Sequence, residues 1–230
     1  MNPLRWLQPI VTLMSLVVLF AGCAQLPEYA RPQFYRSEKN SVSSKTGFGY
    51  RQLVIDDFQA TSLADSSEAS HKHIYARSCL TIRPSQKTRI SIFQTAYQGQ
   101  SLFVGKISGA EFEALFIPEC SWWNPEVPAQ RTVYVLEHEQ IHFALAELAA
   151  RLLNRLADDE LDDFIALGND YQEAQQEIIE KLQGMAYQAM ESGLEEHTDF
   201  DENTSLFHDP EAQQSWHQTI EKRLQEEHSK

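Results

Sequence analysis

The stretch VLEHEQIHF, residues 135–143, places an H-E-x-x-H pattern inside an otherwise apolar segment. A helix advances about 100° per residue, so His138 and His142 would lie about 40° apart on one face and could bind one metal ion. Glu139 would lie beside that ion, where its carboxylate can take a proton from water. The pattern predicts Zn²⁺ on His138 and His142, with Glu139 as the general base. The alternative is a helix that carries two histidines without a metal.

Apolar residues recur at helical spacing around this motif and predict a helix from about residue 131 to 156. They are Ile141, Leu145, Leu148, Leu152 and Leu156. Both histidines fall at the edge of this apolar stripe, rather than inside it or opposite it. An ion at that edge would be partly buried and open on one side, which favours a metal site over a chance pattern.

The spacing does not identify the third ligand. Glu147 lies about 140° around the helix from His142, so it would point away and hold the helix in place or make an outer contact to the site. A histidine or carboxylate from later in the chain must complete the site. The candidates are Glu173, Glu177, Glu180, Glu191, His197, Asp201 and His208.

The first residues predict export to the cell envelope. The apolar run over 10–20 is too short to span a bilayer comfortably, and it ends in small residues before Cys23. The sequence LFAGC at 19–23 resembles a bacterial lipobox, so 1–22 would be a lipoprotein signal peptide and Cys23 the lipidated residue. Ala24 resembles the signal that directs lipoproteins to the outer membrane. An ordinary secretory signal with an incidental cysteine is the alternative.

Charge and cysteine content restrict the partners. The net charge of −14 argues against binding to nucleic acid and against electrostatic docking to anionic lipid. The lipid on Cys23 would then provide the membrane affinity. Cys79 and Cys120 are the remaining cysteines, and in an oxidising compartment they would form one disulfide. Two free buried thiols are the alternative.

The remaining chain reads as a polar tether over 23–47 and one domain over 48–230. Strands are expected in the first half, where residues 74–83 alternate apolar and polar side chains. Residues 88–97 could be the hairpin partner of that strand. Further strands are expected at 51–58, 101–107 and 113–117.

Helices are expected in the second half. One would span about 170–194 and end near Gly193, and a last helix would begin at Asp209 as N-cap with Pro210 in its first turn. Strands followed by helices, without alternation, predict an α+β domain with an N-terminal antiparallel β-sheet packed on C-terminal helices.

Several motifs together resemble an uncharacterised family of bacterial secreted proteins described as zinc-dependent proteases. The helix segment HEQIHF, followed by Ala146-Glu147-Leu148 and Ala150-Arg151, is similar to the family's HEQxHF, AEL and AR. Weaker matches flank it at Asp57-Phe58, Ser121-Trp122, residues 200–204, Glu211-Ala212-Gln213 and Trp216. The resemblance implies a zincin-like active-site helix, bound Zn²⁺ and a peptide or protein substrate.

Two positions depart from the family pattern. Ala144 stands where the family has aspartate, and Leu206 stands where the family has a histidine. If that histidine is the family's third ligand, His208 could replace it here. Asp201, which matches the family, is the other candidate ligand or an outer contact.

The leading hypothesis is therefore a lipid-anchored zinc metallopeptidase of the cell envelope, at the outer membrane facing the periplasm. The main alternative is an inactive or structural metal-binding lipoprotein that acts through protein–protein contacts. Cell-wall amide hydrolysis is a weaker third option. Trp122 and Trp123 could line a specificity pocket or belong to the core.

Overall fold

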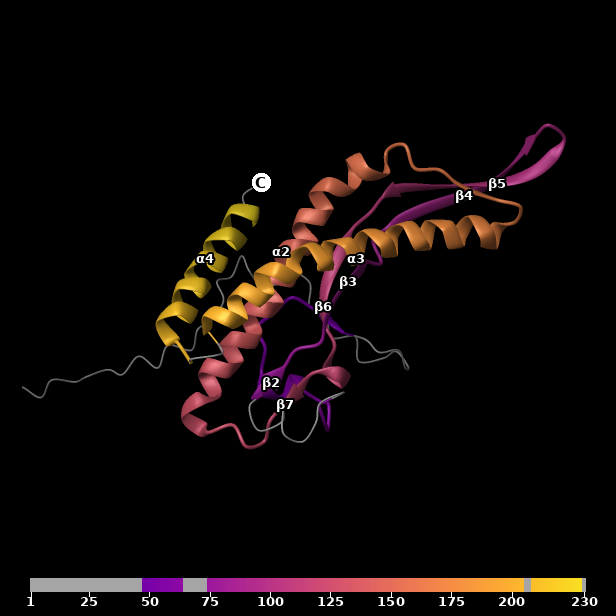
Figure 1. Ribbon diagram of the computed structural model, residues 1–230. Coiled ribbons are helices and arrows are strands. Elements are labelled where there is room, and N and C mark those ends of the chain that lie inside the picture. The colour runs from indigo at the N-terminus through magenta and orange to yellow at the C-terminus, as the bar shows by residue number, and fades with distance from the viewer. Residues whose placement is uncertain (1–46, 64–73, 205–207, 229–230) are drawn as a thin grey trace, which may run out of the picture.

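A computed structural model describes residues 47–63, 74–204 and 208–228. Its strands are β1 (Phe48–Gly49), β2 (Ala76–Arg77), β3 (Leu80–Pro84), β4 (Arg89–Tyr97), β5 (Gln100–Gly109), β6 (Phe112–Phe116), β7 (Trp122–Trp123) and β8 (Ala166–Gly168). The helices are α2 (Thr132–Leu161), α3 (Tyr171–Thr204) and α4 (Pro210–His228), with 3-10 turns η2 (Ile55–Asp57), η3 (Pro118–Cys120) and η4 (Ala129–Arg131). The predicted α+β class is confirmed, with β-structure in the first half and long helices in the second (Figure 1).

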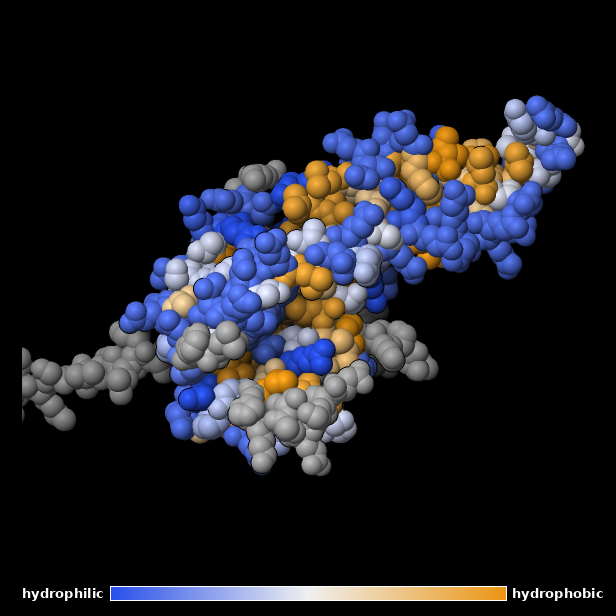
Figure 2. Space-filling view, in the orientation of Figure 1, coloured by the Kyte–Doolittle hydropathy of each residue, from blue (hydrophilic) through white to orange (hydrophobic). Residues whose placement is uncertain are grey.

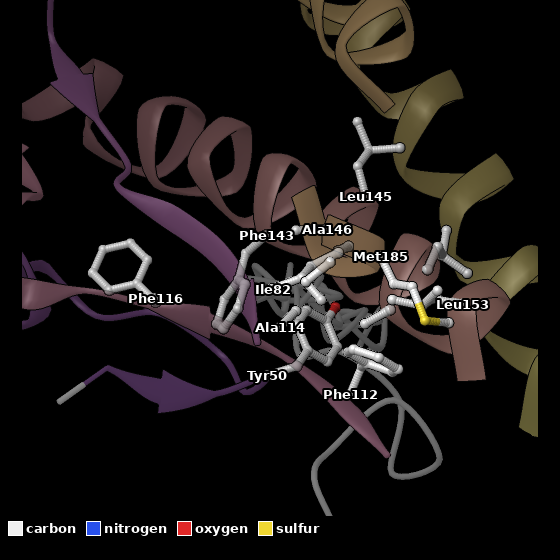
Figure 3. Close-up of a cluster of buried hydrophobic side chains, with 14 of the residues drawn as sticks. Tyr50, Ile82, Phe112, Ala114, Phe116, Phe143, Leu145, Ala146, Leu153 and Met185 are labelled. Carbon is white, nitrogen blue, oxygen red and sulfur yellow. The ribbon is translucent and has the colours of Figure 1, made fainter. Parts of the chain in front are cut away.

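The strands form three small antiparallel sheets in the orders β1-β6-β3, β2-β7 and β4-β5-β8. The first sheet packs against α2, and the large side chains of its inner face meet that helix (Figure 3). Phe143 of α2 lies with its ring centroid 5.8 Å from that of Phe116 and 5.1 Å from that of Tyr50. This aromatic cluster fixes the N-terminal half of α2, where the H-E-x-x-H motif lies.

The hairpin predicted between residues 74–83 and 88–97 is wrong. β3 pairs with β6, with Ile82 opposite Ala114, whereas β4 pairs with β5. The connection between β4 and β5 explains the choice, because Gln98 and Gly99 both have positive φ, as a tight two-residue hairpin turn requires. The β4–β5 hairpin projects from the body of the molecule, and the N-terminal half of α3 runs beside it (Figure 1).

A strand is expected over 51–58, but the structure has an irregular stretch there that ends in η2. Gln140 of α2 explains this conformation because it occupies the backbone groups that a neighbouring strand would need. The N–H of Leu53 donates to Gln140 Oε1 over 2.6 Å, and Gln140 Nε2 donates to the carbonyl of Arg51 over 3.2 Å.

Helix α3 runs through Gly193 to Thr204, so the expected end near Gly193 is wrong. Packing at both ends of the helix outweighs the low helix propensity of glycine. Near its start, Ile178 packs on Gly105 of the hairpin, and near its end Phe200 is fully buried. Continuation past Gly193 is what brings residues 197–204 to the metal-binding motif.

Helix α2 is longer than expected, and its apolar stripe is only partly covered. Ile141, Leu145 and Leu148 are buried, but Leu152 and Leu156 are 48% and 50% exposed. Figure 2 shows the resulting apolar patch where the C-terminal half of α2 lies beside α4. Helix α4 begins as predicted, with Asp209 Oδ1 accepting from the N–H groups of Glu211 and Ala212.

Among the residues that the structure describes, no helix is both long and apolar enough to cross a membrane. The expected signal peptide over 1–22, the lipidated Cys23 and nearly all of the tether over 23–47 lie outside the described residues. The same holds for Leu206.

Candidate metal centre

Three side chains from two helices converge at one point. His138 and His142 lie one turn apart on α2, and Asp201 comes from the last turn of α3. Asp201 Oδ1 lies 3.0 Å from His138 Nε2 and 3.1 Å from His142 Nε2, and the two Nε2 atoms are 3.2 Å apart. These three residues form a group close enough to hold one metal ion, and of the two leading candidates for a third ligand the structure brings Asp201 into it.

The size of this triangle is compatible with a small divalent metal ion, zinc among them. A tetrahedral zinc ion with bonds of about 2.0–2.1 Å has its ligand atoms about 3.3 Å apart. All three measured edges lie close to that length. Two imidazole nitrogens and one carboxylate oxygen are also a common ligand set for catalytic zinc, and they leave a fourth position for water or substrate.

Thr204 assigns the tautomer of His138. Its hydroxyl donates to the carbonyl of Phe200 over 2.6 Å, so the Thr204 oxygen is an acceptor for His138 Nδ1, 3.4 Å away. His138 therefore carries a proton on Nδ1 and can direct the Nε2 lone pair at a metal. Phe200 stacks on the same imidazole, with ring centroids 4.4 Å apart, and holds its plane.

His197 plays the same part for His142. The two Nδ1 atoms are 2.8 Å apart, and the rings are nearly parallel. Burial and the nearby charge of His142 lower the pKa of His197 to about 4, so His197 is neutral at physiological pH. We assign His142 as the Nδ1–H donor and His197 as the acceptor, which leaves His142 Nε2 free for a metal.

Asp201 is suited to remain ionised at this position. Burial favours its neutral form, but hydrogen bonds and charge from His138 and His142 outweigh burial and hold its pKa well below the usual range. A divalent ion in the triangle can replace the protons that these contacts otherwise need. The Asp201 side chain is 52% exposed, whereas those of His138 and His142 are 11% and 14% exposed, so the site is open on the Asp201 side.

Glu139 is held beside the triangle by Ser78. Its Oε2 accepts from the Ser78 N–H over 2.9 Å and from the Ser78 hydroxyl over 2.6 Å. Ser78 precedes Cys79, which forms a disulfide with Cys120, with the sulfurs 2.02 Å apart. The N–H of Cys79 donates to Ser121 Oγ over 2.9 Å. The disulfide and this hydrogen bond fix the backbone that orients Glu139.

The triangle and Glu139 line one cleft of about 710 Å³. The start of α2 and the β2 segment form one wall of the cleft, and Met190 and Leu194 of α3 give it an apolar side. A cleft of this size falls within the volume range typical of ligand-binding sites.

The other predicted candidates lie elsewhere or play other parts. His208 lines the cleft, but its ring packs on Tyr134 at 4.2 Å, and it is not in the metal-binding group. Glu147 pairs with Arg151 on its own helix. Glu173 accepts from the N–H of Asn169, Glu177 accepts from the N–H of Leu167 in β8, and Glu180 accepts from the Gln176 amide. Glu191 is absent from the group as well.

The tryptophans do not line the cleft. Trp122 is 7% exposed and Trp123 packs on Phe58, with ring centroids 5.5 Å apart. The sequence assigned no site role to three residues that support the site, Ser78, Phe200 and Thr204. Residues 200–204 do match the family pattern, but phenylalanine and threonine carry no ligand signature, and Ser78 has no sequence signal at all.

The chain matches no family model, no curated protein and no solved structure.

Proposed function

We propose that this chain is a zinc-dependent metallopeptidase of the cell envelope, anchored by lipid on Cys23. The observation that carries the proposal is the convergence of His138 Nε2, His142 Nε2 and Asp201 Oδ1 within 3.2 Å of one another, beside a buried Glu139. The sequence resemblance to secreted zinc-dependent proteases and the lipobox support the reaction class and the location.

The chain's own residues divide the work of hydrolysis. A bound Zn²⁺ would act as a Lewis acid and lower the pKa of water from about 15.7 toward about 7. Glu139 accepts a proton from the attacking water and can return it to the leaving amine. Ser78 occupies one carboxylate oxygen of Glu139 with two donors and so fixes the direction of the other. Thr204 and His197 keep both imidazoles in the tautomer that binds metal.

The test measures zinc content and proteolysis of an unstructured protein with the purified chain. Zinc should bind one to one, and Glu139→Gln should keep the zinc while activity falls by about 10²-fold or more. Glu137→Gln is the matched control, because Glu137 is on the same helix but does not line the cleft. Equal activity of the Glu139→Gln protein, or no bound zinc in the wild type, would contradict the proposal.

Zinc binding without any hydrolysis would favour the alternative of a structural metal site. In that case His138→Ala should lower the thermal stability and leave no activity to lose.

A further inference from the structure

We propose that the cleft recognises a carboxylate of its substrate through Arg77 and Arg131. This inference rests on the proposed peptidase function, and it names the class of substrate: peptides with an acidic side chain, or a free C-terminal carboxylate, near the cleaved bond.

Ion pairs are unevenly distributed among the described lysines and arginines. The sequence has 33 acidic residues and only 19 lysines and arginines, so every cation has many potential partners. Of the twelve lysines and arginines that the structure describes, eight pair with a carboxylate: Arg51, Arg83, Lys87, Arg151, Arg155, Lys181, Lys222 and Arg223. The four described cations without such a pair are Arg77, Arg89, Lys106 and Arg131. Two of these four, Arg77 and Arg131, line the cleft.

The Arg131 side chain is held in a fixed orientation at the cleft. Its Nη1 donates to Tyr75 Oη over 2.9 Å, and its Cζ lies 5.5 Å from the centre of the Tyr75 ring. Both residues line the cleft, so the guanidinium is held in place before any ligand arrives. The Arg131 guanidinium has five N–H donors, and the bond to Tyr75 is the one side-chain hydrogen bond that it makes among the described residues. A planar guanidinium held in this way is suited to a carboxylate, which it can bind with two parallel hydrogen bonds.

Arg77 and Arg131 both belong to segments next to the proposed catalytic residues. Arg77 directly precedes Ser78, the residue that holds Glu139. Arg131 lies seven positions before His138, or roughly 10 Å along the helix direction at about 1.5 Å per residue. An extended peptide covers that length with about three residues. The recognised carboxylate would therefore lie within about three residues of the cleaved bond.

The charge of the cleft points the same way. Its lining contains two carboxylates, on Glu139 and Asp201, and the former is bonded to Ser78 and the latter to the two histidines. A divalent ion with Arg77 and Arg131 makes the cleft cationic in a chain of net charge −14. Such a local field attracts an anionic group and disfavours a lysine at the same substrate position.

The experiment compares short peptides of alanine, leucine and glycine with blocked ends that carry one glutamate or one glutamine at a scanned position. A third peptide has glutamine and a free C-terminal carboxylate, which separates the two sources of the anion. Binding is measured on the zinc-loaded Glu139→Gln chain, and kcat/KM on the wild type. We expect at least one carboxylate peptide to exceed its neutral match about tenfold in both measurements.

Substitutions of the two arginines test the assignment. Arg77→Gln with Arg131→Gln should reduce the preference to nearly one, and Arg89→Gln, a hairpin cation also without an ion pair among the described residues, should leave it unchanged. Arg77→Glu should shift the preference toward a lysine peptide, a gain that misfolding cannot produce. Cleavage without a carboxylate preference, or no binding of any peptide, would overturn the inference. A carboxylate preference in binding without cleavage would support it and overturn the proposed peptidase activity.

Discussion

At the scale of single residues, Thr204 shows how an uncharged side chain supports the site. It is fully buried, and its hydroxyl accepts from His138 only because it donates to the carbonyl of Phe200. Thr204→Val removes this acceptor with little change in volume. We expect zinc affinity to fall about tenfold to hundredfold, as measured by chelator competition.

Thr198→Val is the matched control for this change. Thr198 is exposed on the same helix, and its hydroxyl also donates to a carbonyl one turn earlier, that of Leu194, over 2.9 Å. Its substitution should leave zinc affinity unchanged. Equal losses for both variants would show that the effect comes from the helix rather than from His138.

The third ligand can also be decided at this scale. Asp201→Asn replaces the carboxylate with an amide that carries no charge, and we expect zinc affinity to fall more than the hundredfold that outer contacts typically give. His208→Ala should leave affinity nearly unchanged, because its ring packs on Tyr134. Chelator competition measures both, and a larger loss for His208→Ala would reverse the assignment.

The sequence predicts His138, Glu139 and His142 as one site because their relation is local, set by the turn of one helix. Asp201 lies 59 residues from His142, and its approach depends on how α3 crosses α2. Sequence spacing carries no information about that crossing, so Asp201 and His208 remain equal candidates until the fold is known.

Among the elements, the contact between the β4–β5 hairpin and α3 can be tested by a substitution at Gly105. A Cβ at this position would lie 2.7 Å from Ile178 Cδ1 and 3.1 Å from Ala166 Cβ. Gly105→Ala should lower the free energy of unfolding by about 1–3 kcal/mol, because α3 or β8 must shift. Denaturant unfolding measures this change.

Gly184→Ala, within α3 itself, should have the opposite effect. A Cβ there has no atom within 4 Å, so the substitution should raise stability by about 0.5–1 kcal/mol through helix propensity. A loss of stability at Gly184, or none at Gly105, would contradict the packing described here.

Element types were easier to predict than element partners. Alternation over 74–83 predicts one β-strand, whereas the segment divides into two short strands, β2 and β3, that lie in different sheets. Period two also does not say which strand lies beside each of them. The turn at Gln98-Gly99 is a local signal that favours β4 with β5. Low helix propensity predicts an end of α3 near Gly193, but the packing of Phe200, which is buried only in the assembled fold, carries the helix past that residue.

For the molecule as a whole, the disulfide affects both the stability of the domain and the geometry of the site. Cys79 and Cys120 are 41 residues apart, a separation for which chain entropy gives about 4 kcal/mol. Replacing both with serine should lower the free energy of unfolding by about 2–4 kcal/mol. Activity should fall by more than the loss of folded protein explains, because the backbone of Ser78, which orients Glu139, is no longer fixed.

Thermal unfolding and kcat measured below the transition separate these effects. The Cys79→Ser substitution leaves Ser78 itself in place. A lower kcat in fully folded protein would therefore show that Glu139 has lost its orientation. An unchanged kcat together with a lower melting temperature would show that the disulfide stabilises the fold without orienting Glu139.

Because α3 is unbroken, it restricts the insertions that this chain can accept between Ile178 and Asp201. Ile178 faces the hairpin and Asp201 faces the histidines, 23 residues later, or about 35 Å along one rigid rod. Inserting one residue between them would rotate one end against the other by about 100°, and one of the two contacts would be lost. An insertion of seven residues comes within about 20° of two full turns and keeps both faces in phase, but it moves the two contact points about 10 Å further apart along the helix axis. The angular position of the third ligand is thus set by the hairpin contact at the far end of the helix.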